Sequence, residues 1–397
     1  MSGLVIVGAG PAGIAAAVTA GEATVLDDNP AVGGQIWRGG RSNQSNRWLD
    51  ALARSSVKVV SGARVVSGDA GRQTLLVERN GRAETIAYCK LILATGAREL
   101  FLPFPGWTLP NVMGVGALQA LVKSGLPVKG KRIVVAGSGP LLLAVASYLK
   151  KCGASVPLIA EQADLASLAA FSVSLAAHPA KLWQAIRLRP QRYLTSCWIE
   201  AALGTKQVER VRLRHGGRVW EEPCDYVANA YGFVANTELA TLLGCAMENG
   251  AVKVDSMQQT SVPNIYCAGE SAGVGGLDTA LLEGQIAAGA ARLQPQLRKA
   301  RSFARLLNAT FPPRAELRTL AQADTIVCRC EDVTLSRLRN ADSWRSAKLH
   351  ERCGMGPCQG RICGPAVQFM LGWEHGSVRP PLFPTRLENL VQENSVK

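Results

Sequence analysis

Residues 4–28 read LVIVGAGPAGIAAAVTAGEATVLDD, and this stretch decides the fold. The apolar run 4–7 predicts a buried strand, the glycines after it predict a tight turn, and the alanine-rich run predicts a helix. A second apolar run then ends in Asp27 and Asp28. Strand, turn, helix and strand in this order predict an α/β unit, in which a helix connects two parallel strands.

The three glycines of the turn have separate roles. Gly8 permits the tight turn, Gly10 lets the backbone approach a pyrophosphate, and Gly13 allows the helix to pack closely on the strand. The helix that follows this turn offers free N–H groups to a phosphate. An acid after the second strand can accept hydrogen bonds from a ribose diol. The stretch therefore predicts a dinucleotide site, with a glycine turn that binds nothing as the alternative.

Three later motifs resemble those of glutathione-reductase-type flavoproteins. Residues 29–38 read NPAVGGQIWR, and the paired glycines at this place in that superfamily pass close to the flavin. Residues 91–97, LILATGA, resemble its ATG strand end, and residues 264–270, NIYCAGE, resemble its third flavin motif. The superfamily usually has Asp where this chain has Glu270, and either carboxylate can accept a hydrogen bond from a ribityl hydroxyl. The resemblance implies that the chain binds FAD.

These motifs together imply a set of FAD-binding residues. The set is Gly8, Gly10, Pro11, Ala12, Gly13, Asp27, Asp28, Gly33, Gly34, Gln35, Arg38, Ala94, Thr95, Gly96, Gly269 and Glu270.

A second strand, turn and helix lies between the flavin motifs, where residues 132–143 read RIVVAGSGPLLL. The arrangement resembles reductases with two dinucleotide domains, in which this insert binds NAD(P)H. Gly137 and Gly139 are kept, but Leu142 replaces the third glycine and would push helix and strand apart. The next strand leads to Glu161 without an arginine pair for a 2′-phosphate, which disfavours NADPH. Two interpretations stay open: an adenine nucleotide (ATP or NAD) with its ribose on Glu161, or an empty structural fold.

The chain lacks two features that would make it a self-contained catalyst. No CxxC accompanies the flavin motifs, which excludes a dithiol relay. Its four histidines, at 178, 215, 350 and 375, are interpreted as solvated or structural. No catalytic residue is therefore assigned, and two redox cofactors without an acid–base pair indicate an electron relay.

Five of the eleven cysteines crowd into residues 328–363. Residues 327–334 read VCRCEDVT and residues 352–365 read RCGMGPCQGRICGP. A CxC and a CxxxxC supply four thiolates, which is what a 2Fe–2S cluster needs, and the glycines leave N–H groups for its sulfurs. Zinc is the alternative for a four-cysteine site.

The CxxxxC spacing occurs twice, so the sequence offers five candidates for four places. The segment resembles the bacterioferritin-associated-ferredoxin-like (BFD-like) domain, in which the pair aligned with Cys358 and Cys363 binds the cluster. The resemblance implies Cys328, Cys330, Cys358 and Cys363 as ligands and leaves Cys353 as a nearby neutral thiol.

The chain as a whole resembles one family, the FAD-containing alpha-type component of amino-acid and opine dehydrogenases. Its members are D-hydroxyproline dehydrogenase, octopine/nopaline oxidase, dye-linked proline dehydrogenase and hydrogen cyanide synthase. The resemblance implies a hetero-oligomer, in which a beta subunit of the D-amino-acid-oxidase type oxidises the amine. It also implies FMN at the alpha–beta interface, a small ferredoxin-like gamma subunit in some complexes, and electron transfer onward to an acceptor at the membrane.

The expected fold class is α/β, with two Rossmann-like, glutathione-reductase-type domains and a small helical BFD-like domain. The FAD domain is expected at 1–105 and 235–295, and the second dinucleotide domain at 106–234. A linker at 296–324 is expected to lead to the iron–sulfur domain at 325–397.

Composition limits the remaining functions. The chain has 397 residues, of which 47% are hydrophobic and 19% charged, so it can form packed cores. The net charge of +14 lies mostly in residues 178–220 and 292–318, but aromatic residues are only 6%. Few aromatics disfavour base stacking, so we expect no nucleic-acid partner. No stretch is apolar enough to span a bilayer, and we expect a cytoplasmic protein. Two alternatives are a stand-alone NADH-dependent reductase and a redox-sensing regulator that binds nucleic acid.

Overall fold

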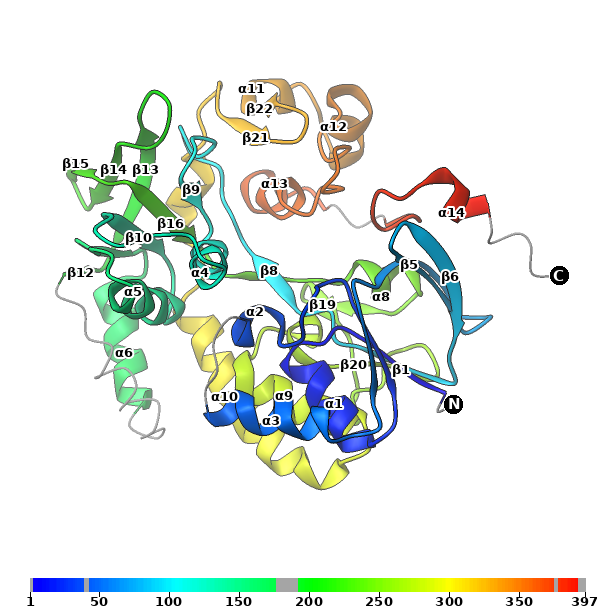
Figure 1. The fold of residues 1–397 in the computed structure, drawn as a ribbon. Helices are drawn as coiled ribbons and strands as arrows, with labels where there is room; N and C mark the ends of the chain where they lie inside the picture. The colour runs from blue at the N-terminus through cyan, green and yellow to red at the C-terminus, as the bar shows by residue number, and fades with distance from the viewer. Residues whose placement is uncertain (1–2, 39–42, 176–191, 375–377, 392–397) are drawn as a thin grey trace. The chain divides into compact units, whose positions relative to one another are not determined.

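The structure is a computed structural model that describes residues 3–38, 43–175, 192–374 and 378–391, and it divides the chain into two compact units (Figure 1). Unit 1 comprises the described parts of Met1–Arg98, Val234–Arg305 and Ser377–Lys397. Unit 2 comprises the described parts of Glu99–Phe233 and Leu306–Gly376. The chain passes from unit 1 to unit 2 within β8 (Ala97–Glu99) and returns within β17 (Phe233–Ala235).

Unit 1 is built on a five-stranded parallel sheet of order β20-β7-β1-β2-β3. Its strands are β1 (Leu4–Val7), β2 (Thr24–Asp27), β3 (Lys58–Ser61), β7 (Lys90–Leu93) and β20 (Ile265–Cys267). In β1, Val5 and Val7 belong to one buried cluster and Ile6 to another, because successive side chains point to opposite faces of a sheet. Both faces are therefore covered, as expected for a parallel sheet.

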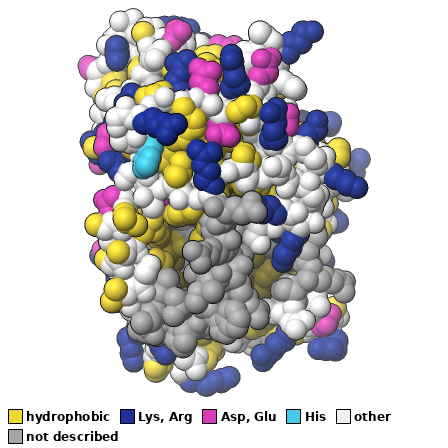
Figure 2. Space-filling view, turned by 90° about the vertical axis from the view of Figure 1, so that its left-hand side faces the viewer, with side chains coloured by type: hydrophobic (Ala, Val, Ile, Leu, Met, Phe, Trp, Pro, Cys, Tyr) yellow, Lys and Arg dark blue, Asp and Glu magenta, His cyan; other side chains and the backbone are white. Residues whose placement is uncertain are grey.

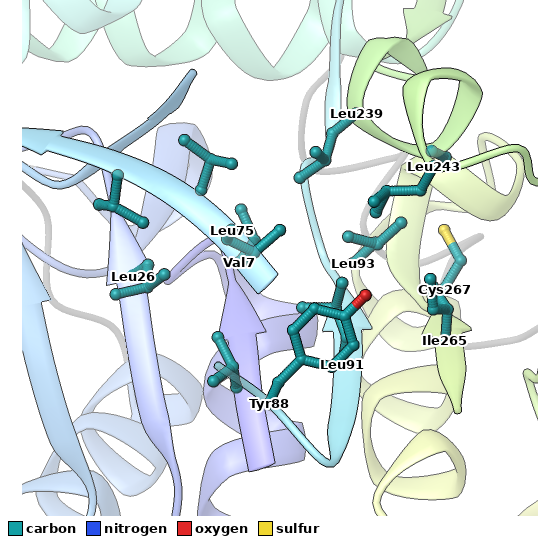
Figure 3. Packing of buried hydrophobic residues seen from close by; sticks show 14 of the residues in the cluster. Val7, Leu26, Leu75, Tyr88, Leu91, Leu93, Leu239, Leu243, Ile265 and Cys267 are labelled. Atoms are coloured by element: carbon teal, nitrogen blue, oxygen red, sulfur yellow. The ribbon is translucent and has the colours of Figure 1, made fainter. Parts of the chain in front are cut away.

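The two faces of this sheet have different covers. One packs against α1 (Pro11–Ala20), α3 (Asn43–Ala53) and α9 (Gly276–Ala287). The other packs against an antiparallel sheet and α8 (Glu238–Leu242), through the residues drawn in Figure 3. That antiparallel sheet consists of β4 (Arg64–Asp69), β5 (Thr74–Arg79) and β6 (Arg82–Ala87).

Unit 2 repeats this plan with another five-stranded parallel sheet, of order β12-β11-β10-β16-β9. Its strands are β9 (Val112–Met113), β10 (Ile133–Gly137), β11 (Ile159–Glu161), β12 (Tyr193–Leu194) and β16 (Tyr226–Ala230). One face packs against α4 (Val115–Lys123) and α5 (Leu141–Lys151). The other packs against the antiparallel sheet of β13 (Cys197–Leu203), β14 (Arg210–His215) and β15 (Arg218–Pro223).

The cysteine-rich region forms the remainder of unit 2 and is mostly helical. Its elements are β21 (Ile326–Cys328), β22 (Val333–Thr334), α11 (Leu335–Leu338), α12 (Trp344–Glu351) and α13 (Cys363–Leu371). It packs around Trp344 and Val367, and Trp107 Nε1 donates to Ile326 O at 2.6 Å. The α/β class with two Rossmann-like sheets and a helical C-terminal region is confirmed.

Smaller elements complete the two units. They are α2 (Gly34–Trp37), α6 (Leu165–Leu175), β18 (Met247–Glu248), β19 (Ala251–Val252), η1 (Gly269–Ala272), η2 (Ala291–Leu293), α10 (Gln294–Thr310), η3 (Ala315–Thr319) and α14 (Leu387–Val391). In the described part of the chain, no helix has both the length and the apolar character needed to cross a membrane.

The expected linker at 296–324 begins inside α10, which spans Gln294–Thr310 and buries Leu297 and Ala304, and it also includes the turn η3. The segment after residue 377 belongs to unit 1 rather than to the cysteine-rich region. Leu382 N donates to Val66 O at 2.7 Å, which ties this segment to β4.

Candidate functional site

The first glycine turn forms an open cradle between β1 and α1. Gly8 has a φ of +108°, and a Cβ there would lie 2.2 Å from Ala94 O. A Cβ on Gly13 would lie 1.8 Å from Gly8 O, so helix and strand are as close as predicted. At Gly10 a Cβ would meet nothing nearer than Gly34 Cα at 4.0 Å. Gly10 thus faces free space, as a residue beside a pyrophosphate must.

The two predicted ribose acids lie in different environments. Asp27 is buried, and its carboxylate accepts hydrogen bonds from Ala9 N and from Asn29 N, the latter at 2.7 Å. Asp28 is exposed and pairs with Arg64 at 3.0 Å. Of the two, only Asp27 lies at the glycine turn.

The GGQ stretch lies against the same cradle. Gly33 N donates to Ala9 O at 2.8 Å, and a Cβ on Gly34 would lie 3.0 Å from Gly10 Cα. Gln35 is exposed in α2, and Arg38 donates to Asn29 Oδ1 in the loop that follows β2. Glycines are therefore required at 33 and 34, because the backbone there passes close to the backbone of the first glycine turn.

The ATG strand end is held by a residue that sequence reasoning missed, Asn236. Its Nδ2 donates to Thr95 O at 2.8 Å, its N donates to Gly96 O at 2.9 Å, and its O accepts from Thr95 Oγ1 at 2.6 Å. Arg98 also donates to Asn236 Oδ1 at 2.7 Å. The one available signal was its position just after the return strand of the insert.

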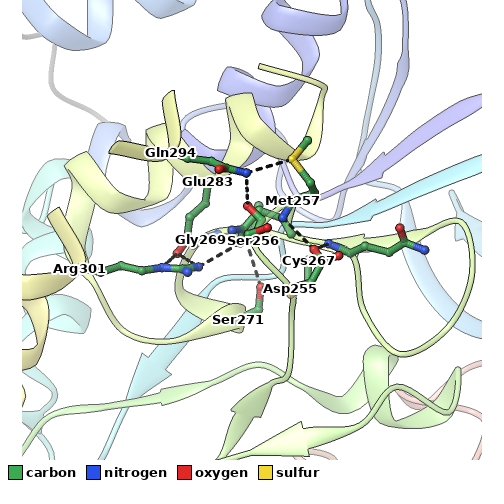
Figure 4. A network of polar contacts seen from close by, with 12 residues as sticks. Asp255, Ser256, Met257, Cys267, Gly269, Ser271, Glu283, Gln294 and Arg301 are labelled. Carbon is green, nitrogen blue, oxygen red and sulfur yellow. Dashed lines mark hydrogen bonds and ion pairs between the residues drawn. The ribbon is translucent and has the colours of Figure 1, made fainter. Parts of the chain in front are cut away.

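The third flavin motif is held by a second missed residue, Glu283 of α9 (Figure 4). This carboxylate is only 2% exposed, accepts from Gly269 N at 2.9 Å and pairs with Arg301 at 2.7 Å. Within the described chain, the neighbouring Glu270 carboxylate has no hydrogen-bond or ion-pair partner, and burial raises its pKa. The Glu270 carboxylate is therefore available to accept a hydrogen bond from a ligand hydroxyl. The Glu283 carboxylate instead binds Gly269 N and Arg301.

The second glycine turn differs from the first, because the polar groups beside it form hydrogen bonds with other residues of the chain. Glu161 is 0% exposed and accepts from Gly139 N at 2.7 Å, from Ala163 N at 2.9 Å and from Tyr193 Oη at 3.2 Å. Burial raises its pKa above the ordinary value. Leu142 is fully buried in the core beneath the turn. A ribose diol would have to displace these contacts to reach Glu161.

Residues 311–314 cover the second turn. Ser138 Oγ donates to Phe311 O at 3.3 Å, and Gln162 Nε2 donates to Pro312 O at 3.0 Å. Arg314 N in turn donates to Gln162 Oε1 at 2.9 Å. A Cβ on Gly139 would lie 3.8 Å from the Phe311 ring. The place where a pyrophosphate would approach Gly139 is thus lined by the chain itself.

The five clustered cysteines form an inner group and an outer pair. Cys328, Cys353 and Cys363 are buried, and their Sγ atoms lie within 4.8 Å of one another. Gly354 N donates to Cys328 Sγ at 3.4 Å. The outer pair is Cys330, which is exposed, and Cys358, which is half-buried; burial and the neighbouring Cys358 thiol raise the pKa of Cys330.

Hydrogen bonding within the inner group separates its pKa values. The Cys353 and Cys363 thiols both donate to Cys328 Sγ, which lowers the pKa of Cys328 to about 2. The same contact raises the pKa of Cys353 to about 12 and raises that of Cys363 as well. Such bonds stabilise a thiolate at Cys328, the form that binds a metal.

Cys353 lies beside two of the expected ligands, as a nearby thiol would, and the expected ligand set itself stays a prediction. Arg352 and Gly354 both have positive φ, at 62° and 79°, so the chain turns after α12 and directs Cys353 inward. Of the four expected ligands, Cys328 and Cys363 lie with it. Cys330 and Cys358 lie together but outside the inner group.

In the described part of the basic segment of unit 2, residues 192–220, several arginines pair with neighbouring acids. Arg212 of β14 pairs with Glu221 of β15 at 3.0 Å, Arg214 pairs with Glu200, and Arg192 pairs with Glu222 at 3.3 Å. Figure 2 shows Lys and Arg side chains spread over one face with Asp and Glu among them.

Comparison with known proteins agrees with the two Rossmann-like units. The family model for pyridine nucleotide-disulphide oxidoreductases matches residues 2–291. The A-subunit of opine oxidase from Rhizobium meliloti is 32% identical, over 98% of this chain and 87% of its own. Hydrogen cyanide synthase subunit HcnB of Pseudomonas aeruginosa is 30% identical over 90% of each chain. The crystal structure of L-proline dehydrogenase from P. horikoshii superposes with a TM-score of 0.70 at 19% identity, covering 98% of this chain and 78% of that one.

Proposed function

The chain belongs to the pyridine nucleotide-disulphide oxidoreductase family and, within it, to the group of HcnB and the opine oxidase A-subunits, and from that premise we propose its role. We propose an FAD- and 2Fe–2S-containing electron-transfer (alpha) subunit of a hetero-oligomeric amino-acid or opine dehydrogenase. The substrate would be of the hydroxyproline, proline or opine type, and the amine would be oxidised in a separate beta subunit.

The flavin part of the proposal is supported by the first cradle. Gly10 leaves room for a pyrophosphate, Asp27 lies at the turn to receive a ribose, and Glu270 keeps a carboxylate for the ribityl chain. A bound FAD would accept a pair of electrons and release them singly. Thr95 and Gly96, held by Asn236, would keep the cradle in shape.

The cluster part rests on the single observation that carries the proposal: three buried cysteine sulfurs converge within 4.8 Å, beside a further pair. Cysteine-only donor sets suit iron–sulfur clusters and zinc alike. The flavoprotein fold of the rest of the chain favours 2Fe–2S, because such a cluster moves electrons and zinc does not. Cys328 and Cys363 would bind it from the inner group, with Cys330 and Cys358 from the outer pair.

Oxidation of the substrate in another chain is supported by the histidines of the described residues, none of which lies in a buried site. In the described residues the only histidines are His215 and His350, and both are exposed. His178 and His375 lie outside the described residues. As partner we propose a D-amino-acid-oxidase-like beta subunit, with FMN at the shared interface. The same proposal includes a ferredoxin-like gamma subunit, electron transfer to an acceptor at the membrane, and a cytoplasmic location.

The alternative of a stand-alone NADH-dependent reductase is disfavoured by the second glycine turn. Glu161 is closed to solvent at 0% exposure, and residues 311–314 cover the turn through contacts with Ser138 and Gln162. We therefore propose that this second fold is structural and holds neither NAD nor ATP. NADH should not reduce the flavin rapidly in anaerobic stopped-flow, whereas dithionite should. Reduction by NADH at catalytic speed would favour the stand-alone reductase.

Purification of the native complex tests the proposal as a whole. Mass spectrometry should find a second, flavin-containing chain, and metal analysis should find iron in this chain together with FAD. Amine-dependent dye reduction should require both chains. Zinc in place of iron, or amine oxidation by this chain alone, would contradict the relay.

A further inference from the structure

The cysteine region holds one thiol more than a 2Fe–2S cluster can bind. Such a cluster takes four cysteine ligands, and five cysteines lie in this region. We assign the extra thiol to the inner group. That group has three thiols, whereas the outer pair has two. Any surplus ligand is therefore one of Cys328, Cys353 and Cys363.

Cys353 is held in place by packing. Its side chain is 0% exposed, and its N–H donates to Ala347 O at 3.2 Å. The next residue, Gly354, has no room for a side chain, since a Cβ there would lie 2.7 Å from the Trp344 ring. The backbone on both sides of Cys353 is thus tied to α12, which keeps its sulfur beside those of Cys328 and Cys363.

We propose that Cys353 is a reserve ligand, which binds iron when Cys328 or Cys363 is lost and is otherwise a protonated neighbour. This inference rests on the proposed iron–sulfur cluster. In the exchange, the bond between iron and the departing sulfur breaks and a bond between iron and Cys353 Sγ forms. The Cys353 thiol proton passes to the departing thiolate, or to solvent where that cysteine is absent. No electron is transferred, and the charge of the site is unchanged.

The reserve role is specific to the inner group. Cys330 and Cys358 are not members of the group whose sulfurs all lie within 4.8 Å of one another. Gly356 also abuts Cys330 so closely that a Cβ there would lie 2.3 Å from Cys330 Cβ. Because the loop between Cys353 and Cys358 is fixed at this point, Cys353 cannot replace an outer ligand without rebuilding the loop.

Alanine variants of the full chain test the proposal, because a serine oxygen could itself bind iron. Iron content and the EPR spectrum of the dithionite-reduced protein are measured, with retained FAD and far-ultraviolet circular dichroism as checks of folding. Cys353→Ala should keep its iron and the wild-type spectrum. Cys363→Ala should keep its iron with shifted g-values, while Cys353→Ala/Cys363→Ala should lose the iron. Cys358→Ala is the matched control and should lose iron although Cys353 is present.

The outcomes separate this inference from the proposed function. Wild-type protein without iron would contradict the cluster itself. Iron in the wild type but equal loss in Cys363→Ala and in the double variant would overturn the reserve role. Loss of iron in Cys353→Ala alone would make Cys353 a permanent ligand and would also overturn it.

Discussion

At the scale of single residues, the glycines of the first turn divide into two kinds. Gly8 and Gly13 are needed by the protein, because a Cβ at either would collide with backbone oxygen atoms. Gly10 is free of such contacts. A side chain at Gly10 would therefore leave the fold intact and fill only the cradle.

This difference makes Gly10 a test of flavin binding alone. We expect Gly10→Val to fold normally but to be purified without FAD, because its branched side chain would occupy the pyrophosphate position. Absorbance of released flavin and circular dichroism measure the two properties. Gly217→Val, in an exposed turn with nothing within 4 Å of the added Cβ, is the matched control and should keep its FAD. A folded Gly10→Val protein with normal flavin content would contradict the site.

At the scale of elements, helices α9 and α10 meet through the ion pair between Glu283 and Arg301. Glu283 is buried, whereas the Arg301 side chain is 33% exposed. Burial raises the pKa of Glu283 above its ordinary 4.5, and Arg301 opposes that shift. Because the unfolded chain loses this proton first, stability falls as the pH rises from 4.5 to the folded-state pKa.

Removing the positive charge of Arg301 should make the loss of stability with rising pH larger. Arg301→Met leaves a buried carboxylate unpaired, and we expect a loss of about 2 kcal/mol near neutral pH, below the usual value for a buried pair because Arg301 is partly exposed. The loss should be larger at pH 8 than at pH 5, since the raised pKa of Glu283 makes its charged form more populated at the higher pH. Urea unfolding at both values measures it, with exposed Arg298→Met of the same helix as control. A loss independent of pH would show that packing, not charge, is what Arg301 contributes.

At the scale of the whole molecule, the chain leaves unit 1, enters unit 2, and repeats the excursion before its last segment returns to unit 1. Asn389 anchors that return. It is only 2% exposed, accepts from Ala83 N at 3.1 Å and donates to Glu78 Oε2 at 3.0 Å. The described part of the last segment is therefore held to β5 and β6 of unit 1.

Releasing this anchor should loosen the end of the chain. We expect Asn389→Ala to lower the free energy of unfolding by about 1–2 kcal/mol, because buried partners lose their hydrogen bonds. Limited proteolysis should then remove the last segment faster than in the wild type. Glu388→Ala affects only an exposed pair with Arg386 and should change neither property. Equal protease resistance of Asn389→Ala and the wild type would rule out the anchor.

The sequence by itself determined the fold class and the positions of the cradles. Glycine motifs can be recognised locally, because Gly8 and Gly13 lie where no other residue fits between two backbones. Their order along the chain then predicted two Rossmann-like units and a cysteine-rich region. The sequence also restricted any cluster to five thiols.

Only the tertiary structure decided how these parts are used. It separated Asp27 from Asp28, and it brought Asn236 to the ATG strand end and Glu283 to the third flavin motif. In the folded chain, residues 311–314 cover the second glycine turn, which lies about 170 positions earlier. The Cys353 sulfur lies beside those of Cys328 and Cys363. The physical reason is the same in each case. These contacts are selected by packing and not by the spacing of motifs, and several join residues more than 100 positions apart.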